Sequence, residues 1–391
     1  MLSVALPVIG FTAISAVVTV YALYFAIVLR NRKSISDLQE SYTELQKATS
    51  NTKAVSIIIS TYNEAEVIAR KLENISELDY PTQKLEIIVV DDASTDGTGE
   101  IAKRKLREKK LKGKVIRNSS RIGLNRSLNI AMAEAKNNLV CITDSDVLLK
   151  ESALRNSVSV LTQFADVGGV TGRIQPIFEE NGFAQTMENS YRGFYHKSML
   201  AESSIHSAFP GNGPLIVFNK SKVPYSIPVD YGSTDGNIAI NIIKSGLRYV
   251  YVPNVVVFEP VPETLSQQRL QKVRRAKRLV QVFLHNADIL MNKKYDGFGR
   301  IVFPLKFLMI TLCPFLMVFG LSFILAYILL AQSILLYSFS IIAVASFLAG
   351  ALLFRQTGSM LSSFVFHQIY LIVGLATSFR KSVFWRTIRR K

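Results

Sequence analysis

Apolar residues gather at the two ends of this 391-residue chain, and mixed apolar and polar segments lie between them. Residues 4–29 form an almost unbroken apolar run, longer than the roughly 20 residues that cross a bilayer as a helix. The run starts without charge and is followed by Arg30, Arg32 and Lys33, whereas a cleavable signal peptide has a basic start and a shorter apolar core. We therefore predict a retained transmembrane anchor over residues 1–33, with its C-terminal side in the cytoplasm.

A second apolar block covers residues 301–354 and is too long for one membrane span. We expect two spans here, with a break near residues 331–333. A third candidate segment, residues 361–379, holds His367 and Gln368 and precedes a basic tail at 380–391. Three spans would place this tail outside, against the positive-inside rule, so either the last segment lies in the membrane interface or the rule fails here. The C-terminal membrane region is thus predicted over residues 301–379, with two or three segments.

Between these ends, short apolar runs alternate with helical patterns. A polar linker is expected over residues 34–53 and a folded domain over residues 54–260. Strands alternating with helices predict an α/β fold with a mostly parallel sheet and helices on both faces. The expected strands cover residues 54–60, 85–90, 114–117, 139–143 and 248–252, and the clearest helices are one that ends near residue 78 and one that spans residues 123–135.

Polar side chains follow three of these strands at the point where each strand ends. They are Tyr62 and Glu64, then Asp91-Asp92, and finally Asp144-Ser145-Asp146. Open α/β sheets bind ligands outside the carboxyl ends of their strands, and two carboxylates at i and i+2 suit Mg²⁺ or Mn²⁺ bound to a diphosphate. Each cluster alone could be a capped turn or a first-turn charge. All three on consecutive strand ends predict a binding site.

Charge and composition narrow the function further. The formal net charge of +17 could indicate nucleic-acid binding, but much of the excess lies beside apolar segments and favours anionic lipid headgroups. We predict no nucleic-acid partner. The two cysteines imply no disulfide framework, and the four histidines show no zinc-ligand spacing. No dinucleotide-binding glycine motif or P-loop accompanies a strand, which argues against a dehydrogenase or a kinase.

The ordered motifs Ser60-Thr61-Tyr62-Asn63-Glu64, Val90–Thr98 and Thr143–Asp146 resemble glycosyltransferase family 2, over about residues 55–278. The resemblance implies a GT-A nucleotide-sugar-binding fold and inversion at the anomeric carbon. It also implies that Ser60, Tyr62, Glu64 and Asp92 hold the nucleoside, that Asp144 and Asp146 hold the divalent cation and the diphosphate, and that Asp146 is the direct metal ligand.

Many relatives have Gly-Lys at the start of the helix that begins near Gly123, and here Leu124 takes the lysine position. Arg121 or Arg126 is a candidate to supply the missing charge. The glycines of Gly211-Asn212-Gly213-Pro214 either permit close approach to a ligand near the acceptor or only make a turn.

Thr234-Asp235 matches the family position whose final Asp is the catalytic base. Asp235 would deprotonate the acceptor hydroxyl, and a helix N-cap is the alternative interpretation. Gln271 and Arg274 match the Gln-x-x-Arg-Trp segment of cellulose, chitin and hyaluronan synthases, with Arg275 at the Trp position. In those synthases the Arg binds the diphosphate, and the missing Trp argues against long-chain processivity. The same region, 261–300, also reads as a basic amphipathic helix at the membrane surface, and we expect one helix to serve both purposes.

The sequence therefore predicts a multi-pass cell-membrane enzyme with a cytoplasmic catalytic domain. It would transfer a sugar from a nucleotide sugar, with a UDP-sugar as the expected donor, to a lipid-linked or growing saccharide acceptor, using Mg²⁺ or Mn²⁺. Two alternatives remain. One is a polyprenyl-phosphate sugar synthase of the same family, although such enzymes lack the Gln-x-x-Arg helix. The other is a membrane scaffold or transporter with an inactive transferase-like domain, and transport would predict ionisable residues within the spans.

Overall fold

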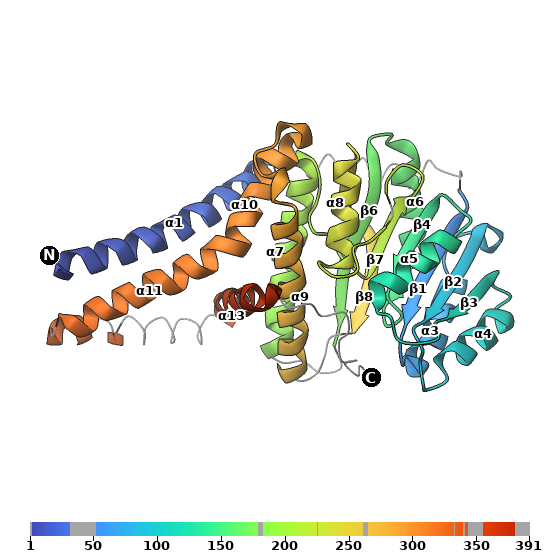
Figure 1. The fold of residues 1–391 in the computed structure, drawn as a ribbon, viewed down its shortest axis with the longest axis horizontal. Coiled ribbons are helices and arrows are strands. Elements are labelled where there is room, and N and C mark those ends of the chain that lie inside the picture. The colour runs from blue at the N-terminus through green and yellow to red at the C-terminus, as the bar shows by residue number, and fades with distance from the viewer. Residues whose placement is uncertain are drawn as a thin grey trace.

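The structure is a computed structural model that describes residues 2–31, 52–178, 183–224, 226–260, 265–331, 333–338, 341–342 and 355–379. An α/β domain occupies one end of the elongated molecule, and two long apolar helices extend from the other end (Figure 1). Helices α7 (Phe183–Ile205) and α9 (Leu265–His285) stand between these two parts (Figure 1). The site described below lies on the domain side of this boundary.

The domain is built on one eight-stranded sheet with the strand order β3-β2-β1-β4-β7-β6-β8-β5. Four of the seven pairings are parallel, and β4–β7, β6–β7 and β5–β8 are antiparallel. The sheet is therefore mixed, with its parallel half at the N-terminal side of the domain. Its strands are β1 (Val55–Thr61), β2 (Leu85–Asp91), β3 (Gly113–Arg117), β4 (Leu139–Thr143), β5 (Leu148–Leu149), β6 (Val167–Ile177), β7 (Leu215–Asn219) and β8 (Arg248–Pro260).

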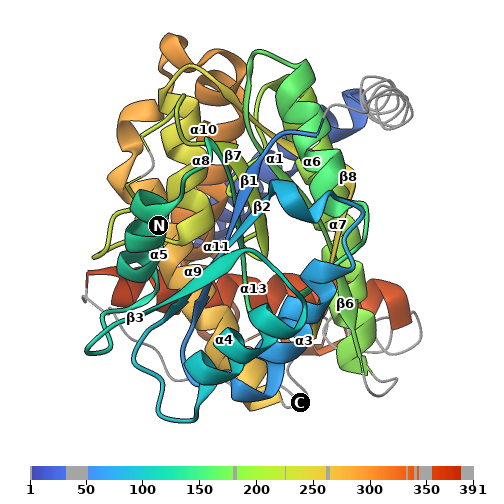
Figure 2. The same cartoon turned by 90° about the vertical axis from the view of Figure 1, so that its right-hand side faces the viewer.

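Two hydrophobic cores cover the two faces of the sheet. Alternate side chains of one strand point to opposite faces, so Ile57 and Ile59 of β1 enter one core and Ile58 enters the other. The first core includes residues of α3 (Ala65–Ser76), α4 (Thr98–Glu108) and α6 (Ala153–Gln163). The second includes residues of α5 (Leu124–Glu134), α8 (Thr234–Lys244) and α9. Figure 2 shows these helix layers from the sheet end of the molecule.

The strands and helices expected at residues 54–60, 85–90, 114–117, 139–143 and 123–135 are all present, within one or two residues at each end. Three long elements between residues 153 and 205 were not anticipated: α6, β6 and α7. Strand β8 continues to Pro260, well beyond the short strand expected from residue 248. It does so because its outer half pairs with β6 through Ile177.

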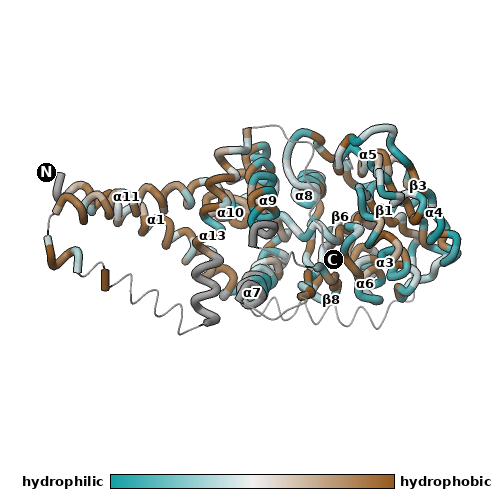
Figure 3. Tube along the Cα trace, turned by 90° about the horizontal axis from the view of Figure 1, so that it is seen from below, coloured by the Kyte–Doolittle hydropathy of each residue, from teal (hydrophilic) through white to brown (hydrophobic). Residues whose placement is uncertain are grey.

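Among the residues that the structure describes, two helical segments are long and apolar enough to cross a membrane, judged by length and composition. They are α1 (Leu2–Arg30), apolar over Ala5–Val28, and the segment Phe298–Leu330, which ends in α11 (Cys313–Leu330). The two pack side by side with Gly10 and Gly320 at their closest approach. Both helices are mostly hydrophobic in the hydropathy colouring (Figure 3). Many of their apolar side chains are exposed, among them Phe11, Val18, Phe315 and Leu325. An exposed apolar surface of this extent is typical of a membrane contact.

The last helix, α13 (Arg355–Ser378), packs on α9, and a Cβ at Gly374 would lie 2.9 Å from the backbone of Ala276 and Lys277. It runs crosswise to α1 and α11 (Figures 1 and 2). Most of the second span expected within residues 301–354, most of the linker at 34–53 and the basic tail at 380–391 lie outside the described residues.

Candidate active site

The loops after β1 and β2 form one hydrogen-bonded unit. The backbone N–H of Asn63 donates to Ser94 Oγ at 3.0 Å, and that of Glu64 donates to Thr98 Oγ1 at 2.9 Å. Asn63 has a φ of 53°, a left-handed conformation that asparagine tolerates better than most residues. The hydroxyl groups of the Ser-Thr-Asp-Gly-Thr segment therefore hold the Tyr-Asn-Glu turn in place. The two segments that the sequence assigned to nucleoside binding lie next to each other.

Asp92 is almost fully buried and binds the start of α5. Its Oδ1 accepts hydrogen bonds of 2.9 Å from the Ile122 N–H and from Asn118 Nδ2, and its Oδ2 accepts one of 2.9 Å from the Gly123 N–H. These bonds attach the loop before α5 to the carboxyl end of β2. Beside them, the Arg121 guanidinium lies 3.8 Å from the centre of the Tyr62 ring. Of the two arginines considered for the missing lysine charge, Arg121 thus stacks on Tyr62.

Asp144 and Asp146 lie on the turn directly after β4, and both are partly exposed. Because β2, β1 and β4 are parallel neighbours, this turn lies at the same edge of the sheet as Asp92 and Tyr62. No group of three or more His, Cys, Asp or Glu side chains that could hold a metal occurs among the described residues. Two carboxylates fit a Mg²⁺ or Mn²⁺ ion whose other ligands are diphosphate oxygens and water, which is how Mg²⁺ is usually bound.

Lys71 of α3 lies directly behind this turn and is completely buried. Its Nζ donates to Thr143 Oγ1 at 2.8 Å and to the Val147 carbonyl at 2.9 Å. Burial lowers the pKa of Lys71 to about 8, although the charges of Asp144 and Asp146 oppose this effect. The sequence analysis did not identify this residue. The signal was present, because Lys71 falls among the apolar positions of an amphipathic helix at Ile68, Leu72 and Ile75.

Asp235 is in the first turn of α8, at the same edge of the sheet. Strand β7 begins beside the end of β4, where Leu215 pairs with Thr143, so the loop before β7 reaches this edge. Gly213 lies in this loop, and a Cβ built on it would lie 3.9 Å from the Asp235 carboxyl carbon. The N-cap is Ser233, whose Oγ accepts from the Gly236 N–H, so the alternative of Asp235 as the N-cap was wrong. Burial raises the pKa of the Asp235 carboxyl, and a hydrogen bond with Ser233 partly opposes this.

Helix α9 passes this edge and carries the matched Gln and Arg. Gln271 is buried, and its Nε2 has no hydrogen-bond partner among the described residues. Arg275, at the position of the family's Trp, forms a 2.7 Å ion pair with Glu259 at the end of β8. Arg192 of α7 also contacts Glu259, at 3.0 Å. The aromatic position of the synthases is therefore taken by a cation that is part of an ion-pair network. Arg274 lies on the same helix, partly buried.

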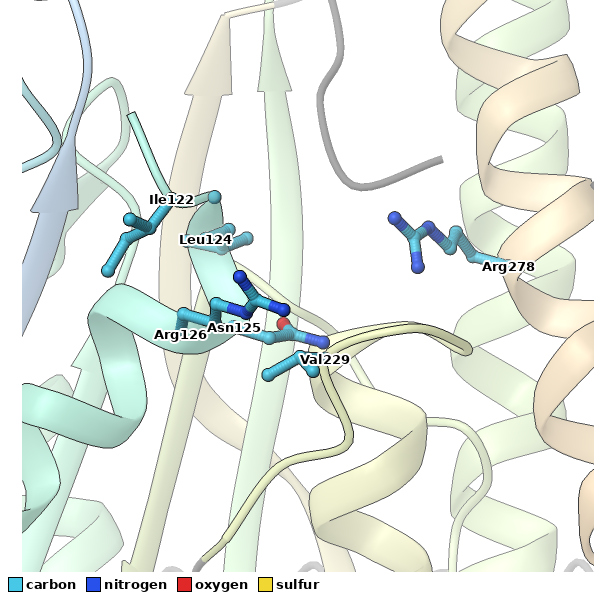
Figure 4. A pocket seen from close by; sticks show the side chains of 7 residues that line it. Ile122, Leu124, Asn125, Arg126, Val229 and Arg278 are labelled. Atoms are coloured by element: carbon cyan, nitrogen blue, oxygen red, sulfur yellow. The ribbon is translucent and has the colours of Figure 1, made fainter. Parts of the chain in front are cut away.

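A small pocket lies between the start of α5 and helix α9. Arg126 and Arg278 reach toward it from opposite sides, with Asn125 and Val229 between them (Figure 4). Arg278 is buried and donates to the Gly232 carbonyl at 3.3 Å, and burial lowers its pKa. Two guanidinium groups at one small pocket favour an anionic group. Arg278 was not identified from the sequence, in which it is one of several basic residues of an amphipathic helix.

The two halves of the site are joined through α5. Thr234 Oγ1 donates to Asn125 Oδ1 at 2.7 Å, and Asn125 Nδ2 donates to the Pro228 carbonyl at 2.7 Å. The helix start that Asp92 holds is thus bonded to the segment that carries Asp235. The residues assigned from the sequence to the strand ends and to α8 lie at or beside this one edge of the sheet: Ser60, Tyr62, Glu64, Asp92, Asp144, Asp146 and Asp235. Gln271 and Arg274 lie on α9, the helix that also carries Arg278 of the pocket.

This arrangement defines a class of protein. The sheet is a mixed α/β sheet with carboxylates at three adjacent strand ends. Asp235 and the basic helix α9 lie beside them. This arrangement is the GT-A fold of nucleotide-sugar transferases. Residues 56–218 match the family described as Glycosyl transferase family 2. Residues 56–218 thus form a family 2 glycosyltransferase domain.

Particular relatives agree with this class. Poly-beta-1,6-N-acetyl-D-glucosamine synthase of Staphylococcus aureus is 29% identical over 265 residues, which are 66% of this chain and 60% of that protein. The chain thus spans less than two thirds of the length of that curated relative. The probable glycosyltransferase YdaM of Bacillus subtilis is 26% identical over 307 residues, 74% of this chain and 67% of that protein.

A solved structure is similar over nearly the whole chain. It is the mannosyltransferase PcManGT from Pyrobaculum calidifontis in complex with GDP-Man and Mn²⁺, with 26% identity and a TM-score of 0.70. The similarity covers 92% of this chain and 99% of that one, so it extends well beyond the α/β domain.

Proposed function

We propose that this protein is a membrane-bound, metal-dependent, inverting glycosyltransferase that acts at the cytoplasmic face of the cell membrane. It moves a sugar from a nucleotide sugar to a saccharide or lipid-linked acceptor. The observation that carries the proposal is the convergence of Asp92, the Asp144–Asp146 turn and Asp235 on one edge of the sheet, beside helix α9. A scaffold with an inactive domain has no need for this convergence.

The donor would bind across the ends of β1, β2 and β4. Ser60, Tyr62, Glu64 and Asp92 would hold the nucleoside, and Asp144 and Asp146 would hold a divalent cation that neutralises the diphosphate, with Asp146 as the direct ligand. The GDP-Man and Mn²⁺ of the similar mannosyltransferase support a nucleotide sugar with a divalent ion. The sequence favours a UDP-sugar and that structure contains a GDP-sugar, so both donors belong in the test.

Asp235 would act as the base. The acceptor hydroxyl oxygen bonds to the anomeric carbon while the bond from that carbon to the diphosphate oxygen breaks, and the hydroxyl proton passes to the Asp235 carboxylate. Burial supports this role, because a carboxyl whose pKa is raised toward the working pH is a stronger base. The position of Gly213 supports it further, since the absence of a side chain there leaves space beside the carboxylate.

Basic side chains of α9 would stabilise the leaving diphosphate. Arg274 is the matched residue of the family segment, and Arg278 lies one helical turn further on. Together with Arg126, Arg278 offers the anion-binding charge that Leu124 cannot supply. Within the described residues Gln271 Nε2 has no hydrogen-bond partner, which supports a ligand in the adjoining space, because buried polar groups are normally hydrogen-bonded.

The acceptor would approach along the membrane boundary. Helices α7, α9 and α13 lie between the domain and the apolar helices, so an acceptor attached to a lipid can reach Asp235 without leaving the interface (Figure 1). At the family's Trp position, Arg275 pairs with Glu259 and offers no aromatic face for a growing chain. We therefore propose addition of one or a few sugars. A polyprenyl-phosphate acceptor is the second candidate, favoured by the number of cations on α9.

The test uses the full-length protein in detergent or nanodiscs with Mn²⁺ or Mg²⁺. Release of nucleoside diphosphate is measured with UDP- and GDP-sugars, against saccharide, glycolipid and polyprenyl-phosphate acceptors, beside Asp235→Asn. Metal-dependent release with one donor, lost in the variant, would support the proposal. Equal release by wild type and variant with a polyprenyl phosphate would favour the second candidate, since a phosphate needs no base. Failure to bind any nucleotide in calorimetry would favour the inactive-domain alternative.

A further inference from the structure

Lys71 carries a charge that is costly in free energy to bury at its position. The side chain is completely buried in the core between α3 and the sheet, where a methionine or leucine would pack without desolvation cost. Burial lowers the pKa of its amine to about 8. A buried ammonium persists in a folded protein only with hydrogen-bond and charge partners, so its contacts indicate what it is held there for.

The contacts of Lys71 bracket the metal turn. Its Nζ donates to Thr143 Oγ1 on one side of Asp144-Ser145-Asp146, at 2.8 Å, and to the Val147 carbonyl on the other side, at 2.9 Å. Both flanks of the turn are thereby attached to helix α3. The charges of Asp144 and Asp146 also favour the protonated form of Lys71. The amine therefore holds both flanks of the turn, and its positive charge offsets part of the repulsion between the two carboxylates.

The hydrogen bond between Lys71 and Thr143 is linked to a second one on the acceptor side of the site. Thr143 Oγ1 accepts from Lys71 and donates its own hydrogen to the Pro214 carbonyl at 2.8 Å. Pro214 follows Gly213, where a Cβ would lie 3.9 Å from the Asp235 carboxyl carbon. One hydroxyl group thus connects the metal turn with the loop beside Asp235. The donor and acceptor halves of the site share this hydrogen-bond chain.

We propose that Lys71 is a positioning residue of the transfer reaction, acting through Thr143 to fix the Asp144–Asp146 turn relative to the loop beside Asp235. This inference rests on the proposed function, because it assigns the turn to the metal and Asp235 to the acceptor. Small displacements of groups that hold a reacting centre can cost about a hundredfold in rate. The nucleoside loops after β1 and β2 are held by their own hydrogen bonds and do not depend on Lys71.

The test exploits the hydroxyl of Thr143. Thr143→Val keeps the branched shape and removes both hydrogen bonds, while Thr143→Ser keeps the hydroxyl and loses only a methyl group. The full-length variants are compared with wild type by Mn²⁺ binding in the presence of UDP or GDP, followed by electron paramagnetic resonance, and by kcat and KM for the nucleotide sugar. Thermal unfolding is recorded for each protein.

We expect Thr143→Val to weaken Mn²⁺ binding and to lower kcat, each by about tenfold or more, with KM for the donor within about threefold of wild type. Thr143→Ser should stay within about threefold in all three quantities. A purely structural role would instead lower the unfolding temperature of both variants and leave Mn²⁺ binding by the folded protein unchanged. That result would overturn the inference.

Lys71→Met gives an independent measure through a double-mutant cycle. If Lys71 acts through Thr143, Lys71→Met/Thr143→Val should lose no more than about threefold in kcat beyond Lys71→Met alone. Multiplying losses would overturn the inference, and so would wild-type kcat in Lys71→Met. The outcomes stay distinct from a failure of the proposed function, in which the wild-type protein itself would bind neither Mn²⁺ nor a nucleotide.

Discussion

Lys306 Nζ lies 2.6 Å from Glu202 Oε1, and this ion pair joins the long apolar segment to helix α7 at the boundary of the catalytic domain. Both side chains are buried, and Glu202 also accepts a hydrogen bond from the Tyr24 hydroxyl of α1 and one from the Phe209 N–H. A single carboxylate therefore bonds to both apolar helices and to the domain. The apolar helices are part of the folded unit and are not attached through a linker alone.

The first prediction concerns this carboxylate. Glu202→Leu should lower the free energy of unfolding by about 3–5 kcal/mol, because it leaves the Lys306 ammonium buried without its counter-charge. Glu202→Leu/Lys306→Met should recover much of the loss, since it removes both charges. Unfolding in detergent can be followed with a thiol-reactive dye, because Cys141 and Cys313 are buried in the folded protein. A double variant no more stable than Glu202→Leu would contradict this account.

The second prediction separates activity from stability at Asp235. Asp235→Asn should lower kcat by about 10²–10⁴-fold, the usual contribution of a positioned base. The raised pKa of Asp235 means that the folded protein binds this proton more tightly than the unfolded chain does. The ionised group therefore lowers stability at neutral pH, and asparagine removes that cost. We expect an unfolding temperature equal to or above that of wild type, and a lower one would count against burial as the cause.

The same shift predicts a pH profile. Only the ionised Asp235 can accept the acceptor proton, so kcat/KM should fall as the pH falls through a pKa above the ordinary 3.8 of aspartate. The remaining activity of Asp235→Asn should lack this acidic limb. An acidic limb of equal position and depth in the variant would assign the titration to another group.

The third prediction concerns stability at alkaline pH. Lys71 has a pKa of about 8 in the folded protein and an ordinary value of 10.5 when unfolded. Between these values the unfolded chain binds more protons, so stability should rise with pH across this window. The difference corresponds to about 3 kcal/mol. Subtracting the profile of Lys71→Met isolates the effect, and identical slopes for both proteins would contradict it.

The fourth prediction tests the contact between α1 and α11. A Cβ at Gly320 would lie 2.9 Å from the Gly10 carbonyl oxygen, so Gly320→Ala must push the two helices apart. We expect a loss of about 1–3 kcal/mol, as for overpacking elsewhere. Gly193→Ala is the matched control, because this helical glycine has no atom within 4 Å of an added Cβ. Its unfolding temperature should be unchanged or higher.

The fifth prediction concerns the pocket between Arg126 and Arg278. If these guanidinium groups bind a phosphate of the substrate, Arg126→Gln and Arg278→Gln should each raise KM for that substrate by about tenfold or more. Arg104→Gln on the exposed face of α4 serves as the control for loss of one positive charge. Comparing KM for the nucleotide sugar with KM for the acceptor shows which of the two places its phosphate there. Unchanged values for both would exclude this role.

The secondary structure and the order of the motifs in this protein can be predicted from its sequence alone. The strands, the acidic turn at Asp144 and Asp146 and the long apolar helix near the N-terminus follow from short-range patterns, because alternation, turn residues and apolar length depend on neighbours in the chain. The same holds for the order of the motifs, since consecutive parallel strands place their carboxyl ends at one edge. The sequence alone therefore predicted that Asp92, Asp144 and Asp146 lie at the same edge of the sheet.

The tertiary structure decided what depends on distant pairing. Strand β7 enters antiparallel beside β4, and this brings the loop beside Asp235 to the metal turn. Helix α3 buries Lys71 behind Thr143, which lies 72 residues further along the chain. The apolar positions Ile68, Leu72 and Ile75 place Lys71 on the core-facing side of its helix, but this pattern does not distinguish a buried amine from one that reaches solvent. Burial is set by which elements pack together, and that choice is made by the whole fold.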